Sequence, residues 1–142
     1  MHGMKQRMDR VVVRTGGRQL VDVTTKVASA VSASGLREGL VTVFVRHTSA
    51  SVIIQENADP AVLRDMERFF ARLVPDGDRI FEHVDEGPDD MPAHVRAALT
   101  ATQVAIPFTA GKLLLGTWQA VYLFEHRHAA HQREIVLHVL GE

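Results

Sequence analysis

The sequence contains no cysteine, and this absence removes several kinds of chemistry at once. Without thiols the chain forms no disulfide, offers no thiolate ligand to a metal ion and has no thiol nucleophile. Eight histidines remain as soft nitrogen ligands. A chain without disulfides suits a reducing compartment, so we expect a cytoplasmic protein.

Long apolar runs and an excess of either charge are also missing. No run approaches the roughly 18 apolar residues of a membrane span, and the N-terminal "MHGMKQRMDR" has no apolar core of a secretory signal. Sixteen Lys and Arg against 17 Asp and Glu give a formal charge of −1. A charge this close to zero creates no long-range field that attracts polyanions. We therefore expect neither nucleic acid nor a membrane as a partner.

The length and hydrophobic content predict one domain over residues 1–142. A chain of 142 residues with 46% hydrophobic residues is long enough to bury roughly two-thirds of its unfolded surface in a single core. Neither repeats nor linker-like segments divide it.

Short β-rich runs at both ends of the chain predict antiparallel strands. "RVVVRT" and "RQLVDV" flank Gly16 and Gly17, which is typical of a hairpin. "LVTVFVRH" (40–47) is apolar enough for a central strand, and "SVIIQE" (51–56) is its expected neighbour. A brief strand is expected at "IFEH" (80–83), and further strands are expected in "TQVAIPFT", "KLLLG", "TWQAVYLFEHR" and "REIVLHVLG".

Three segments have the periodicity and end signals of helices. A short helix is expected over 24–34 and ends at Gly35. A long helix follows Asp59 and Pro60, and its apolar face, expected to lie on the core, comprises Leu63, Met66, Phe69, Phe70 and Leu73. A second short helix begins near Asp90 and carries His94 in its first turn. With about seven or eight strands, the sequence predicts the α+β class.

Three histidines, His47, His83 and His94, lie at the ends of predicted elements, where scaffolds present reactive side chains. A helix N-terminus disfavours imidazolium, so His94 keeps a lone pair available for a divalent metal. The spacing matches no compact zinc motif such as HExxH. Nearby Glu86 and Asp90 form either a solvated acidic loop or part of a mixed imidazole and carboxylate site.

A second histidine cluster, "EHRHAAHQR" (125–133), is the alternative metal site, through His126, His128 and His131. A polar turn with solvated histidines explains it more simply. Arg127 within it is able to hold a phosphate bidentately. Farther back, Trp118 is expected in the core and Gln119 on the opposite face of the same strand, where it meets a ligand.

Three motifs in order, "HTSASVIIQENADP", "EHVDEGPDDMPAH" and "GKLLLGTWQAVYLFEHR", followed by a final "GE", resemble the YjbQ family, known as secondary thiamine-phosphate synthases. The resemblance implies an α+β fold with a β-sandwich-like core, a homotrimer, and a pocket near the subunit interface. In that pocket the motif histidines His47, His83 and His94 would bind one divalent metal ion, zinc in preference, with magnesium accompanying a diphosphate substrate.

The resemblance also implies an activity, the condensation of hydroxymethylpyrimidine diphosphate with thiazole phosphate, as a main or a secondary role. The residues expected to take part are Glu86, Asp90 and Gln119 in catalysis and Thr48, Ser49, Asn57 and Arg127 in binding the phosphorylated substrate. "HRHAAHQR" departs from the shorter ending of part of the family, which bears on Arg127. Two alternatives stay open, a non-catalytic trimeric protein that binds a metal or a small anionic metabolite, and metal-assisted hydrolysis.

Overall fold

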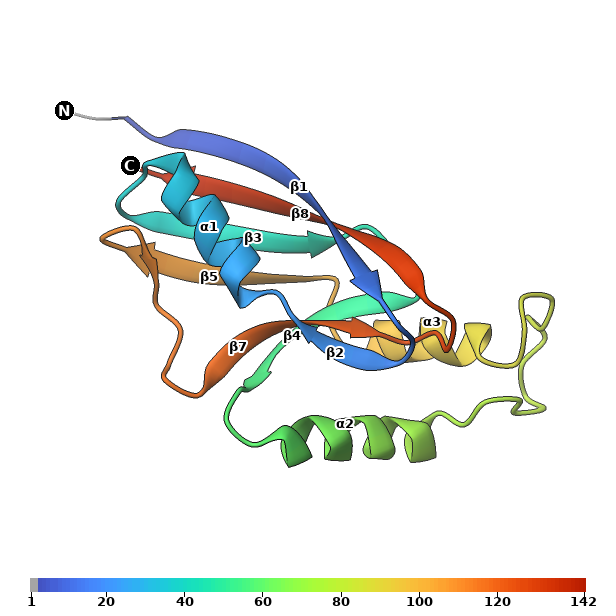
Figure 1. The fold of residues 1–142 in the computed structure, drawn as a ribbon. Helices are drawn as coiled ribbons and strands as arrows, with labels where there is room; N and C mark the ends of the chain where they lie inside the picture. The colour runs from blue at the N-terminus through green and yellow to red at the C-terminus, as the bar shows by residue number, and fades with distance from the viewer. Residues whose placement is uncertain (1–2) are drawn as a thin grey trace.

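A computed structural model describes residues 3–142 as a single α+β domain with antiparallel strands in two sheets (Figure 1). This architecture confirms the predicted fold class. The elements in chain order are β1 (Lys5–Thr15), β2 (Gln19–Asp22), α1 (Thr24–Ser34), β3 (Gly39–Val45), β4 (Ala50–Glu56), α2 (Pro60–Leu73), α3 (Asp90–Leu99), β5 (Gln103–Thr109), β6 (Lys112–Leu113), β7 (Gln119–Glu125) and β8 (His131–Gly141).

The larger sheet has the strand order β1-β8-β3-β5-β6, and the smaller sheet has the order β2-β7-β4. One face of the larger sheet, with Val41, Val43 and Leu137 among its buried residues, packs against α1 and the smaller sheet. The helices α2 and α3 lie at the side of the smaller sheet (Figure 1). The core is therefore closed on one side of the larger sheet and leaves the other side of that sheet open.

The expected hairpin around Gly16 and Gly17 is wrong, because its two strands belong to different sheets. β1 pairs with β8, and β2 pairs with β7. The chain crosses between the sheets at Gly17, which has a φ of 125°. A Cβ atom at this position would lie 2.8 Å from the His128 carbonyl oxygen, so both the backbone conformation and the lack of space exclude a side chain. A glycine turn is present, as predicted, but it serves a crossover.

The strand β3 is central, as predicted, between β8 and β5. The expected pairing of β3 with β4 is wrong, since β4 pairs with β7 in the other sheet. The residues "HTS" (47–49) carry the chain from one sheet to the other. Alternation along a strand identifies the buried face but does not identify the partner strand, so this error has a physical cause.

The predicted helices are present, with their expected ends at both α1 and α2. Gly35 ends α1 in a left-handed conformation with φ of 70°, and the Asp59 carboxylate caps α2 by accepting a hydrogen bond from Ala61 N–H at 2.9 Å. The core-facing stripe of α2 is narrower than predicted. Phe70 is buried, whereas Phe69 is 48% exposed and Leu73 is 54% exposed.

Two further expectations are wrong. No strand forms at 80–83, since the described chain between α2 and α3 is a loop of turns that joins neither sheet. Trp118 is 63% exposed rather than buried in the core. It lies on the turn before β7, which hydrogen bonds such as Asn57 N–H to Trp118 O at 3.1 Å hold in place.

Candidate metal centre

Two side chains of the centre lie one above the other on the first turns of α3. Asp90 and His94 are four residues apart and therefore share a helix face. The Asp90 Oδ2 atom is 3.1 Å from His94 Nε2 and 2.7 Å from His83 Nε2, which the preceding loop brings in. Within residues 3–142, these three residues form a group whose ligand atoms all lie within 4.8 Å of one another.

The hydrogen bond on the far side of the His94 ring determines which nitrogen is free. His94 Nδ1 is 2.8 Å from the backbone oxygen of Thr48, and a carbonyl only accepts, so Nδ1 carries a proton. In the neutral ring Nε2 then has a lone pair that faces the Asp90 carboxylate. Two acceptors 3.1 Å apart repel each other unless a cation lies between them. Histidine ligands of metals commonly donate their second N–H in this way.

Asp90 is suited to be an anionic ligand. Its side chain is 2% exposed, and burial alone would raise its pKa. The hydrogen bond to His83 and the positive charge of Arg127 outweigh burial and lower the pKa of Asp90. The carboxylate is therefore ionised at neutral pH. Ligands at about 2.0–2.1 Å from a tetrahedral zinc ion are roughly 3.3 Å apart, so the distances of 2.7 and 3.1 Å from Asp90 Oδ2 to the two imidazoles need only a small increase to hold one.

Arg127 holds the acidic side of the centre. Its Nη1 donates to Asp90 Oδ1 at 2.8 Å, its Nε donates to Asp89 Oδ2 at 3.0 Å, and its Nη2 donates to Glu86 O at 3.0 Å. All three nitrogens of the guanidinium are engaged by these neighbours. The structure thus gives Arg127 a positioning role, in which each of its side-chain nitrogens already donates to a neighbour and not to the phosphate that the sequence assigned to it.

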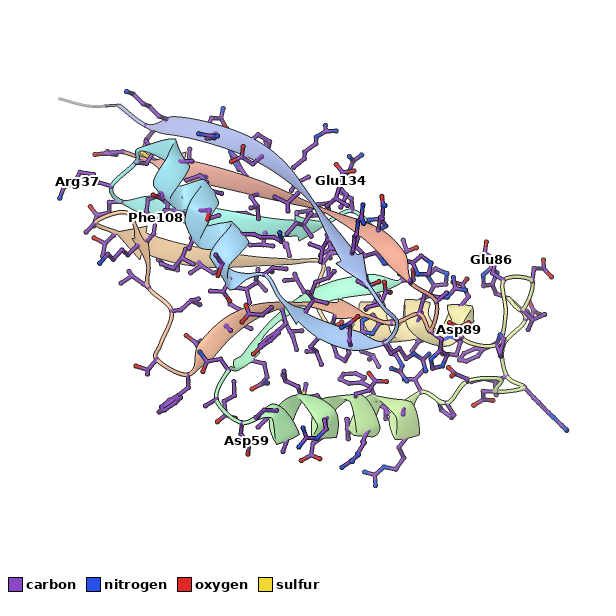
Figure 2. The ribbon with its side chains drawn as sticks, in the orientation of Figure 1. Arg37, Asp59, Glu86, Asp89, Phe108 and Glu134 are labelled. Atoms are coloured by element: carbon purple, nitrogen blue, oxygen red, sulfur yellow. The ribbon has the colours of Figure 1, made fainter. Side chains whose placement is uncertain are left out.

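The acidic loop itself is exposed. Figure 2 shows Glu86 on this loop, which extends beyond α2 and α3, and Asp89 close to α3. Glu86 contributes its backbone oxygen to Arg127. Its carboxylate lies near Asp90, as expected for a group that influences the centre without belonging to the three-ligand group.

His47 lies close to His94 but outside the three-ligand group. With Thr48 and His94 it lines a cavity of about 310 Å³ at the end of α3. Its Nε2 accepts a hydrogen bond from Glu134 N–H at 2.8 Å, which occupies the lone pair that a metal would need. Burial, followed by the charge of Arg133, lowers the pKa of His47 and keeps the ring neutral. Asp90, rather than His47, is the third member beside His83 and His94.

Thr48 and Ser49, two of the predicted substrate residues, are neighbours in the sequence but lie in different surroundings. Thr48 lines the cavity beside His94. Ser49 is buried, and its Oγ accepts a hydrogen bond from Arg133 Nη2 at 3.0 Å, so its hydroxyl serves the core.

The structure does not bring Asn57 and Gln119 to the centre. Gln119 begins β7 whereas Arg127 follows its end, a separation of roughly 25 Å along an extended chain. The Gln119 Oε1 atom accepts a hydrogen bond from Gly116 N–H at 2.8 Å. The Asn57 Nδ2 group donates to Thr117 O at 3.3 Å. Both amides stabilise the turn that carries Trp118.

The alternative cluster does not converge either. His126 is fully buried, its Nε2 lies 2.8 Å from Ser51 Oγ, and burial lowers its pKa to about 3. His128 Nε2 is 2.8 Å from Asp76 Oδ2, and His131 Nδ1 is 2.8 Å from Ala129 O. Each ring thus has its own partner in this part of the chain.

The sequence assigned the third ligand position to His47 and left a mixed imidazole and carboxylate site with Asp90 as an alternative, although a clearer signal for Asp90 was available. An Asp and a His four residues apart at the start of a helix share one face, and His83 lies shortly before them. The pairing of Arg127 with Asp89 and Asp90 had no such signal, because 37 residues separate Arg127 from Asp90.

Comparison with known proteins places this chain in a family. The family model described as "UPF0047 protein YjbQ-like" matches residues 9–142. This chain belongs to the YjbQ-like UPF0047 family. A UPF0047 protein of Synechocystis sp. is 54% identical over 138 residues, which cover 97% of this chain and 94% of the relative. The UPF0047 protein YjbQ of Escherichia coli is 44% identical over 104 residues, 73% of this chain and 75% of the relative.

Solved structures share the fold over nearly the whole chain. A YbjQ-like protein of unknown function from Sulfolobus solfataricus has a TM-score of 0.89 and 29% identity, with 99% of this chain and 100% of that chain covered. A hypothetical protein from Aeropyrum pernix has a TM-score of 0.87 and 32% identity, with 96% and 99% covered. In the described chain, no helix has the length and apolar character needed to cross a membrane.

Proposed function

We propose that His83, Asp90 and His94 bind one divalent metal ion, zinc in preference, and leave part of its coordination shell open. Two imidazole nitrogens and one carboxylate oxygen are a donor set of catalytic zinc sites, in which water or substrate takes the remaining position. The observation that carries the proposal is the lone pair of His94 Nε2, held toward the ionised Asp90 carboxylate by the hydrogen bond of Nδ1 to Thr48. A metal ion bound there would act as a Lewis acid toward a substrate oxygen and lower the pKa of bound water.

The reaction that we propose for the centre is the condensation of hydroxymethylpyrimidine diphosphate with thiazole phosphate. The bond between the pyrimidine methylene carbon and the diphosphate oxygen breaks, the thiazole nitrogen bonds to that carbon, and pyrophosphate leaves. Magnesium would accompany the diphosphate. The family resemblance supports this reaction. Within the chain, Arg127 orients Asp90, the Thr48 carbonyl orients His94, and the Thr48 and His47 side chains border the space beside them.

The charge around the centre favours a second candidate, a non-catalytic protein that binds a metal together with a less highly charged metabolite. Residues 76–90 contain seven acidic side chains and one arginine. Arg127 is already engaged by Asp89 and Asp90. A substrate with several phosphate charges therefore meets few free cations here, apart from the metal itself.

We also propose a homotrimer, as the family resemblance implies. The open face of the larger sheet exposes large apolar side chains, and such a face is typical of an interface between subunits. The residues concerned are Met8, Val12, Leu40, Phe44 and Leu140. Light scattering coupled to size exclusion tests this directly, and a monomer at micromolar concentration would exclude it.

Metal analysis and turnover, measured on the same preparations, distinguish the candidates. We expect one zinc ion per chain in the wild type and in a His128→Ala/His131→Ala control, but loss of the ion from His83→Ala and His94→Ala. Release of pyrophosphate from the two substrates then separates the roles. Turnover that disappears with the metal supports the transferase, and bound metal without turnover supports the binding protein. A wild-type chain that binds no divalent ion rejects both.

A further inference from the structure

The loop that supplies His83 forms its own cavity beside the metal centre. This cavity of about 380 Å³ lies between the loop and the start of α3. His83 belongs both to its lining and to the group with Asp90 and His94. A molecule in the cavity therefore lies next to one of the proposed metal ligands. The volume is at the small end of the range for small-molecule pockets, about 300–1,000 Å³.

The wall of the cavity is mainly apolar. The side chains that make it so are Phe81, Val84, Pro88, Met91 and Pro92. Phe81, Val84 and Met91 lie outside the hydrophobic core cluster, and Val84 is 60% exposed. Apolar side chains on an acidic loop gain little from exposure to water, so their collection around a cavity points to an apolar ligand group. Phe81 and Met91 favour an aromatic ring, through ring–ring and sulfur–ring contacts.

The ends of the loop are fastened, so the cavity is formed before a ligand binds. Gly77 N–H donates to Pro88 O at 3.0 Å and joins the two ends. Gly87 N–H donates to Val84 O at 3.2 Å and Phe81 N–H donates to Asp78 O at 3.3 Å, which fold the segment between them. A closed loop of this length with its own side-chain packing is an Ω-loop, a type that is frequently functional.

We infer that the cavity lined by Phe81, Val84 and Met91 binds an aromatic or heteroaromatic ring of the ligand whose oxygen reaches the metal centre. The ligand is thus a small molecule with a flat ring attached to a metal-binding oxygen group. The part of this inference that concerns the oxygen rests on the proposed function. The ring site itself depends only on the cavity.

Two hydroxamates that bind zinc through the same group test the inference. Benzohydroxamate carries a phenyl ring where acetohydroxamate carries a methyl group. Calorimetric titration of the zinc-loaded protein with each compound therefore measures the contribution of the ring to the affinity. We expect benzohydroxamate to bind at least about tenfold more tightly, because the phenyl ring removes additional apolar surface from water. Phe81→Ala should reduce this preference to about threefold or less while one zinc ion per chain remains bound.

Phe69→Ala is the matched control, since it removes the same ring from an exposed position of α2 outside the cavity. It should leave the preference unchanged. Equal affinities of the wild type for the two hydroxamates overturn the inference. So does a preference that persists in Phe81→Ala, or one that Phe69→Ala removes equally.

The outcome remains clear if the protein binds no zinc. In that case the proposed function fails, and the ring site is tested with phenol on the metal-free chain by NMR. Shifts of the Gly77 and Gly87 amides that are absent in Phe81→Ala support the cavity as a ring site. If phenol does not shift the Gly77 and Gly87 amide signals, the inference that the cavity binds a ring is overturned. A side chain of a second copy that fills the cavity would also overturn it.

Discussion

Replacing Glu125 with glutamine should destabilise the protein strongly, because this carboxylate is the most heavily bonded acid in the described core. It is fully buried and forms an ion pair with Arg133, whose side chain is 4% exposed. It also accepts hydrogen bonds from Thr15 Oγ1 at 2.6 Å and from the backbone N–H groups of His126 and Arg127 at 3.0 and 3.2 Å. Glutamine has nearly the same shape but lacks the charge and presents an N–H₂ group to these donors.

The size of the expected loss in the free energy of unfolding follows from the burial of both Glu125 and Arg133. Removing one member of a buried pair leaves the other uncompensated, which costs about 3–5 kcal/mol. That is a large part of the 5–15 kcal/mol by which domains are typically stable. Urea unfolding of wild type and Glu125→Gln at pH 7 measures the difference. Adding Arg133→Met to the variant should recover part of the loss, because the unpaired cation is then removed.

The pH dependence gives a second measurement of the same interaction. Burial alone would raise the pKa of Glu125, but the hydrogen bonds from Arg133 and Thr15 outweigh it, so the folded pKa is lowered. The stabilisation is therefore complete above the unfolded pKa, near 4.5, and is lost as pH falls through the folded value. The difference in the free energy of unfolding between wild type and Glu125→Gln should therefore become smaller in acid. A difference in unfolding free energy below about 1 kcal/mol at pH 7 would refute this account of the ion pair, and so would a difference that acid does not change.

Three other predictions concern the centre and α2. Asp90→Asn should weaken zinc binding more than about 100-fold. Asp89→Asn, which removes partners of Arg127 and of the His128 N–H but no proposed ligand, should weaken it only about 10- to 100-fold. Calorimetry compares the two variants, and equal effects would contradict the assignment of ligands. Zinc affinity should fall as the pH drops through about 6.5, the range in which imidazoles generally titrate, because protonated rings do not bind metal. A zinc affinity that stays constant from pH 7.5 to 5.5 would exclude histidine ligands. Phe70→Ala should reduce the stability of the isolated subunit by about 3–5 kcal/mol, and Phe69→Ala by under about 1.5 kcal/mol, since only Phe70 is buried against Phe124. Urea unfolding measures both variants, and similar midpoints would show that Phe70 contributes no more to the core than Phe69.

Local signals in the sequence predicted local structure well. The Asp59–Pro60 start of α2 and the Gly35 end of α1 depend on hydrogen bonds and dihedral angles within a few residues, so the sequence contains what is needed to predict them. Strand positions followed from apolar runs for the same reason. The strand "IFEH" failed because four residues with an apolar start do not form a strand without an available edge.

Strand partners were harder to predict, because they depend on contacts that are distant in the sequence. The segments of β1 and β2 look like a hairpin over any short window, and only the pairing of β1 with β8 shows otherwise. Gln119 and Asn57 were wrongly predicted to lie at the metal centre for the same reason, that contacts distant in the sequence are not visible in a local pattern. A residue known to end a strand still has two possible ends of a sheet at which to lie, and pattern alone does not choose between them.

The proximity of the three clustered residues was predictable because it is local. His83, Asp90 and His94 lie within a short stretch of chain, and the sequence brought attention to all three. His47 was added by its place at a strand end, and its lone pair proved to be used by Glu134 N–H. Whether a histidine nitrogen is free is a property of its neighbours in space, so periodicity and spacing do not reveal it.

The end of β7 connects the core to the candidate centre. Glu125 turns inward to Arg133, whereas Arg127, two residues later, turns outward to Asp89 and Asp90. The Arg127 backbone N–H donates to the Glu125 carboxylate, so one buried acid fixes the residue that holds the other acids. Asp90 is thereby fastened at Oδ1 from the core side, and its Oδ2 is left facing the two imidazoles. The end of β7 thus holds Asp90, α3 and the Thr48 carbonyl hold His94, and the exposed loop supplies His83.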